Sequence, residues 1–131
     1  MAKYAKDTDV PVSRSKLHIE RLLTDWGIEE YFFGTSSRGD GIGFKFSDKT
    51  YKLSVPVAND CSEKTRRQMW RILFMSLKMK LEEIDAGLIT FEDQFLSQMA
   101  LPNGSTVGQF MKLPENIALL NKSEMPLMLT A

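Results

Sequence analysis

The side chains best suited to chemistry in this sequence are four cations that crowd a short stretch near its middle. They are Lys64, Arg66, Arg67 and Arg71, with Trp70 among them. Such a cluster can bind phosphate or carboxylate groups, and a neighbouring indole can stack on a base or hold a protein interface. The alternative is structural: Trp70 lies in the core, and the arginines pair with Asp60, Glu63 or carboxylates elsewhere.

Three further cations extend this cluster if the elements that carry them share its side of the molecule. They are Arg38, Lys45 and Lys52, which belong to the predicted sheet. The candidate binding set for a protein or nucleic-acid partner is therefore Lys64, Arg66, Arg67, Trp70, Arg71, Lys45 and Lys52.

Residues for catalysis are poorly represented. His18 is the single histidine, and Cys61 is the single cysteine with no histidine near it in sequence. Adjacent acids such as Glu82-Glu83 point about 100° apart on a helix, so they make poor two-carboxylate sites. The integrin-type tripeptide Arg38-Gly39-Asp40 is best explained by chance. We therefore predict a protein that is not an enzyme and needs no metal or cofactor.

Bulk properties agree with a single domain that binds a partner. The chain has 131 residues, 17 basic and 17 acidic side chains and zero net charge, which argues against a strongly cationic packaging protein. One cysteine permits no internal disulfide and fits a reducing cytoplasm. No apolar run approaches the length of a membrane span, and the N-terminal residues lack the apolar core of a signal peptide.

The cationic cluster opens the longest predicted helix, which runs from an Asp60 N-cap to Gly87. Glu63 would complete a capping box with Asp60, and Gly87 would terminate the helix as the C′ residue. An apolar stripe recurs at three- and four-residue spacings: Met69, Leu73, Leu77, Leu81, Ile84 and Leu88. A second apolar set covers more of the circumference: Trp70, Ile72, Phe74, Met75 and Met79. The helix should be buried on two sides, by its own domain and by a partner or second copy.

The residues before this helix predict one helix followed by a three-stranded antiparallel sheet. Residues 1–12 form a flexible arm, and Ser13 is the predicted N-cap of a helix that ends at Gly27. The predicted strands are Tyr31–Phe33, Ile42–Ser47 and Tyr51–Val57, joined by a loop over Thr35–Gly41 and a turn at Asp48-Lys49. Their alternation leaves one apolar face for the helices and one wet face with Lys45 and Lys52.

The C-terminal third predicts shorter helices and an irregular tail. Thr90 caps a helix with inner residues Phe91 and Phe95, and short segments follow around 107–111 and 115–120. The apolar tail Met125–Leu129 is expected to dock on its own domain or on a neighbour. The fold class is α+β, with residues 13–131 forming one domain: an N-terminal helix, a three-stranded antiparallel sheet, a long central helix and shorter C-terminal helices.

Several stretches resemble a family of small proteins encoded by tailed bacteriophages, and together they cover most of the chain. They are Ser13–Lys16 with Ile19, Glu20 and Leu22, then Trp70-Arg71, Lys78–Gly87, Thr90–Glu92, Phe95-Leu96, Leu101–Gly104 and Thr106–Gly108. Residues 35–57 depart most from the family pattern. The resemblance implies a phage origin and action in the cytoplasm of an infected bacterium, as with products of phage early regions, and it supplies no catalytic residue.

Two functions compete on this basis. The first is a host-takeover or anti-defence inhibitor that docks on a bacterial protein such as a CRISPR effector, or that sequesters a nucleotide immune signal. The second is an accessory protein of phage replication or recombination that binds nucleic acid, most simply single-stranded DNA, through the Lys64–Arg71 cluster. Neutral net charge weakens the second, because phosphate contacts drive most such affinity. A homodimer through the long helix is compatible with either.

Overall fold

The computed structural model describes residues 2–122 and has the α+β architecture that the sequence predicts. The predicted docking of Met125–Leu129 concerns residues outside this part of the chain. The elements, in order, are α1 (Val12–Asp25), β1 (Glu30–Ser36), β2 (Gly39–Phe46), β3 (Lys49–Val55), α2 (Glu63–Asp85), α3 (Phe91–Gln94), the 3-10 turn η1 (Leu96–Gln98), α4 (Val107–Met111) and α5 (Pro114–Asn121).

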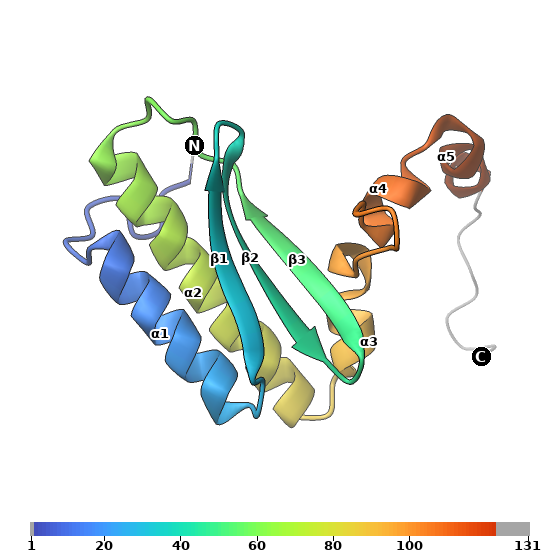
Figure 1. The fold of residues 1–131 in the computed structure, drawn as a ribbon, viewed down its shortest axis with the longest axis horizontal. Helices are drawn as coiled ribbons and strands as arrows, with labels where there is room; N and C mark the ends of the chain where they lie inside the picture. Colours follow the sequence, from blue (N-terminus) through green and yellow to red (C-terminus); the bar gives the residue numbers. More distant parts are fainter. Residues whose placement is uncertain (1, 123–131) are drawn as a thin grey trace.

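The main body has two layers, with the two long helices on one face of the sheet (Figure 1). The strands are antiparallel in the order β1-β2-β3. Helices α1 and α2 lie side by side and begin at the same end of the molecule (Figure 1). Among the described residues, no helix is both long enough and apolar enough to span a membrane.

The β1–β2 connection is much shorter than the sequence predicted. Pairing runs from Glu30 opposite Lys45 to Ser36 opposite Gly39, so the predicted loop over Thr35–Gly41 is mostly strand. Small and glycine residues indicated a loop, but the sheet accepts them because neighbouring strands supply the pairing. At the other hairpin the turn residues are Ser47 and Asp48, with φ of 53° and 66°, one residue earlier than predicted.

Both long helices begin at different caps from those predicted. Helix α1 starts after Pro11 rather than Ser13, and α2 starts after Ser62 rather than Asp60. The Ser62 side chain accepts a hydrogen bond from the Thr65 backbone N–H, so it satisfies an otherwise unpaired donor. Gly87 follows the C-cap Ala86 of α2 and has φ of +81°, which confirms the predicted C′ glycine.

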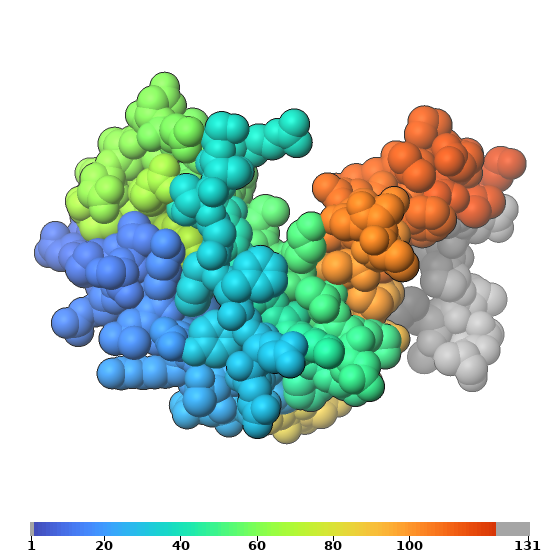
Figure 2. All heavy atoms as spheres, viewed as in Figure 1, coloured from blue at the N-terminus to red at the C-terminus, as the bar shows by residue number. Residues whose placement is uncertain are grey.

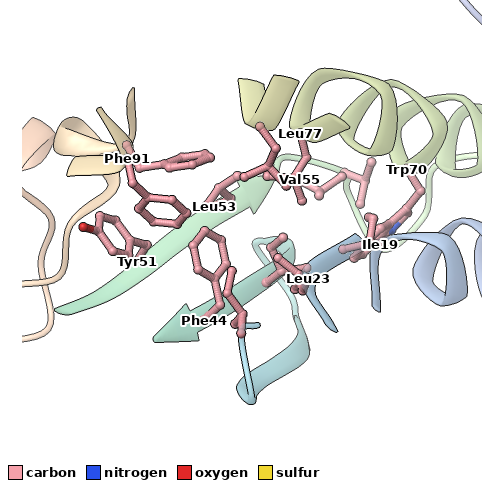
Figure 3. Packing of buried hydrophobic residues seen from close by; sticks show 14 residues of the cluster. Ile19, Leu23, Phe44, Tyr51, Leu53, Val55, Trp70, Leu77 and Phe91 are labelled. Atoms are coloured by element: carbon pink, nitrogen blue, oxygen red, sulfur yellow. The ribbon is translucent and has the colours of Figure 1, made fainter. Parts of the chain in front are cut away.

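The core lies between the sheet and the two long helices, and α3 closes one end of it (Figure 3). Trp70, Leu77 and Leu81 of α2 are fully buried, as are Ile19 and Leu23 of α1. Phe91 of α3 stacks on Phe46 of β2 with ring centroids 4.0 Å apart. The predicted apolar stripe of α2 stops short of Leu88, which follows the helix and is 79% exposed.

Candidate functional site

Two members of the predicted binding set, the buried Trp70 and the half-buried Arg66, bind a carboxylate inside the fold. Trp70 is 0% exposed, and its Nε1 donates to Asp40 Oδ2 at 2.8 Å. Arg66 Nη1 donates to the same oxygen at 2.6 Å, and Arg66 Nη2 donates to the Ala58 carbonyl at 3.2 Å. The proposed stacking of Trp70 on a base is therefore wrong, and the structural alternative is confirmed for Trp70 and Arg66.

Asp40 is a buried carboxylate held by these two donors. Burial raises its pKa, but the hydrogen bonds from Trp70 and Arg66 and the charge of Arg66 outweigh that effect, so the pKa lies below its usual value. With Asp40 only 7% exposed, the Arg38-Gly39-Asp40 tripeptide does not present its carboxylate to a receptor.

The remaining predicted cations do not gather into one patch. Lys64 lies in α2 and pairs with Asp7 of the N-terminal arm at 3.2 Å, while Arg67 is half-buried. Lys45 and Lys52 lie on the open face of the sheet, opposite the face that the helices cover, because they alternate with the buried Phe44, Tyr51 and Leu53. The suggested extension of the cluster onto these two lysines is therefore wrong.

Arg71, the remaining cation of the predicted cluster, lies where α1 and α2 pack together. It is beside His18, Arg21 and Lys78, and we call these four residues the helix seam. These side chains line a hollow of about 340 Å³ together with Leu22, Asp25 and Phe74. Arg71 Nη1 lies 3.1 Å from His18 Nδ1, and its guanidinium lies 4.3 Å from the centre of the Phe74 ring. Both contacts hold Arg71 in one orientation, which prepares it to bind an anion.

The electrostatics at the seam favour a neutral His18. Burial lowers its pKa below 6.5, and the positive charges of Arg71, Arg14 and Arg21 lower it further. A neutral ring leaves Nδ1 free to accept the hydrogen bond from Arg71. Only Arg71 of this group was predicted from the sequence, because the members come from two helices: His18 and Arg71 are 53 residues apart along the chain.

The second candidate site is the C-terminal unit, which we define as residues 96–121. Helices α4 and α5 contain no buried residue, and they stand apart from the two-layered body (Figure 1). Several large apolar side chains of the unit are exposed: Leu96, Phe110, Leu113, Leu119 and Leu120. Among them, Leu119 is 65% exposed and Phe110 is 48% exposed.

The C-terminal unit is joined to the body through backbone contacts at the open edge of β3. The Ala100 N–H donates to the Thr50 carbonyl at 2.7 Å, and Met99 forms a bridge with Tyr51. Thr106 and Gln109 form a reciprocal capping box that starts α4. The base of the unit is therefore held in place, while α4 and α5 display their apolar side chains outward.

No protein-family model, curated protein or solved structure matches the chain. The two candidate sites are therefore judged on their chemistry alone. The helix seam offers positive charge, and the C-terminal unit offers apolar surface.

Proposed function

We propose that this is a non-enzymatic binding protein of phage origin, which docks on a bacterial host protein through its C-terminal unit. It would act in the cytoplasm of the infected cell as a host-takeover or anti-defence inhibitor. The target would be a bacterial immune protein, such as a CRISPR effector.

The observation that carries this proposal is the exposed apolar surface of α4 and α5. Phe110, Leu119 and Leu120 gain only part of the available burial free energy when the isolated chain folds, since each leaves about half or more of its surface in water. Exposed apolar patches of this kind are typical of protein interaction sites. A protein partner would cover these side chains, and aromatic residues such as Phe110 are enriched in the cores of protein interfaces.

The test is affinity purification from bacterial lysate with and without nuclease, using the wild type and a Phe110→Ser/Leu119→Ser double variant. We expect one host protein to survive nuclease treatment with the wild type and to be lost with the variant. Leu17→Ser is the matched control, because Leu17 is an exposed leucine on α1, away from the C-terminal unit. The captured protein, once purified, should form a stable complex and lose activity in it.

Two outcomes contradict docking through this unit. One is equal capture of the host protein by the double variant. The other is a purified target whose activity does not change when the wild-type protein binds. Recovery of further copies of this chain alone would assign the apolar surface to self-association.

A homodimer through α2 is part of the same proposal, supported by Met79, which is 61% exposed on that helix. Ile72 and Met75 of α2 are half-buried, so a second copy would cover them further. Light scattering should give twice the monomer mass for the wild type and the monomer mass for Met79→Lys. A monomer at high concentration in both would remove this part of the proposal.

The helix seam supports a second candidate function, nucleic-acid binding. Arg21, Arg71 and Lys78 have no ion-pair partner among the described residues, and a phosphate backbone would neutralise them. Because Trp70 is buried, contacts with phosphates rather than base stacking would supply the affinity.

Fluorescence anisotropy with labelled single-stranded and duplex DNA tests this candidate. Binding should weaken steeply with salt, and Arg21→Glu or Lys78→Glu should weaken it much more than Lys45→Glu, which makes the same charge change on the open face of the sheet. Equal effects of the three variants would show that the seam is not the binding surface.

A further inference from the structure

A second hollow lies between the open face of the sheet and the C-terminal unit, and its lining includes neither the exposed apolar side chains of α4 and α5 nor any residue of the helix seam. It has a volume of about 350 Å³ and is lined on one side by Lys52 and Ser54 of β3. The opposite wall includes Ser97, Gln98 and Lys112 from η1 and the end of α4. In the space-filling view, the molecule is indented between β3 and the C-terminal unit (Figure 2).

Both walls of this cavity are held by backbone contacts. The β3 wall is part of the sheet, and Ala100 N–H···O=C Thr50 joins the opposite wall to it at 2.7 Å. Inside that wall, a Cβ at Gly108 would lie 3.0 Å from the Ser97 carbonyl oxygen, so α4 packs against η1 at a distance that suits glycine. The cavity therefore exists before any ligand arrives.

The charged groups that line the cavity are all positive. It has two lysines, and none of the described residues that line it carries a carboxylate. Lys52 Nζ donates to the Gly104 carbonyl at 2.7 Å, which fixes its position and leaves two N–H donors for a ligand. Ser54, Ser97 and Gln98 add neutral donors and acceptors around these cations. Aromatic side chains do not contribute to the described lining.

We propose that this cavity binds a small phosphate monoester of a hydroxyl-rich molecule, of the sugar-phosphate class. The ammonium groups of Lys52 and Lys112 would bind the phosphate, since charge-assisted hydrogen bonds to phosphate are stronger than neutral ones. The serine hydroxyls and the Gln98 amide would bind sugar hydroxyls. The volume falls at the lower end of the range for small-molecule pockets and suits a ligand of this size.

Nuclear magnetic resonance titration of the full chain with ribose 5-phosphate tests this proposal. We expect saturable shifts at the backbone amides of Ser54, Ser97 and Gly108. Ribose alone should cause none, and inorganic phosphate should cause weaker shifts at the same amides. Lys52→Gln and Lys112→Gln should each weaken binding by about tenfold or more, whereas Lys45→Gln, on the same sheet face outside the cavity, should not.

The proposal is overturned if ribose 5-phosphate at millimolar concentration produces no saturable shift at these amides. Binding of ribose as tight as that of its phosphate would overturn it too, because the lysines would then play no part. Lys112 is exposed, so Lys112→Gln keeps the test decisive if loss of the Lys52–Gly104 contact disturbs folding. None of these measurements depends on a host protein or nucleic acid.

Discussion

Trp70 of α2 and Asp40 of β2 are joined by a 2.8 Å hydrogen bond from the indole Nε1 to the carboxylate Oδ2, inside the core. Arg66, one helical turn before Trp70, donates to the same oxygen. The Trp70–Asp40 hydrogen bond joins the N-terminal part of the long helix to the start of the central strand. Trp70 and Arg66, which were predicted from the sequence to bind a partner, therefore stabilise the fold.

Replacing Asp40 with Asn should destabilise the protein by about 2 to 4 kcal/mol, because Arg66 would lose its buried counter-charge while the amide oxygen could still accept from Trp70. Urea denaturation followed by tryptophan fluorescence measures this loss. Asp60→Asn removes the same charge at an exposed position and should have little effect. Equal stability of the two variants would contradict the structural role of Asp40.

Lowering the pH should remove the contribution that the Asp40 carboxylate makes to stability. Because the folded-state pKa of Asp40 lies below its ordinary value of 3.8, the folded state binds this proton less readily than the unfolded state. The stability that Asp40 contributes is therefore fully present above pH 3.8 and is lost as the pH falls through its folded-state pKa. Denaturation curves across this window should show a steeper loss for the wild type than for Asp40→Asn.

The single histidine allows a direct test of the helix seam. Proton resonances of His18 should titrate with a pKa below 6.5, and Arg71→Gln should raise that pKa by removing a nearby positive charge. Burial would still keep it depressed in the variant. An unchanged titration in Arg71→Gln would show that the two side chains are not in contact in solution. A polyanion bound at the seam of the wild-type protein should also raise the pKa of His18.

Gly39 follows the β1–β2 turn at a position where only glycine fits. Its φ is +135°, and an added Cβ would lie 2.6 Å from the Val55 carbonyl oxygen. Gly39→Ala should therefore cost at least about 2 kcal/mol in stability, through both strain and a backbone clash. Gly27→Ala is the control: φ is +81° with no atom near the added Cβ, so a cost of about 1 kcal/mol is expected. Similar melting temperatures for both variants would refute the clash.

Much of the fold was predictable because it depends on local periodicity. Alternation in Ile42–Phe46 and Tyr51–Val55 gave two strands with the correct buried faces, and Gly87 marked the end of α2. The first residues of the helices were harder to predict. For α2, both Asp60 and Ser62 are good N-caps, and they lie two residues apart. Which residue caps depends on where the chain leaves β3, and this is not a property of the local sequence.

The candidate sites were predicted less well, for a physical reason. Arg66, Trp70 and Arg71 are close along one helix, but the use of each is decided by a partner elsewhere: Asp40 for the first two and His18 for the third. The helix seam and the cavity between β3 and the C-terminal unit both arise from residues that are far apart in sequence. The exposure of Phe110 and Leu119 likewise depends on the absence of packing around α4 and α5 in the described chain.

Because the C-terminal unit is weakly packed, the backbone amides of the protein should fall into two classes that differ in their rate of hydrogen exchange. In β2, which is paired on both sides and buried on one face, exchange with solvent requires global unfolding. In α5, which has no buried residue, the helix can open by itself, so its amides exchange at rates that are independent of the stability of the core. A partner bound to α5 would slow amide exchange in that helix before it affected exchange in β2. The exchange rate of the α5 amides therefore reports whether a partner occupies this surface.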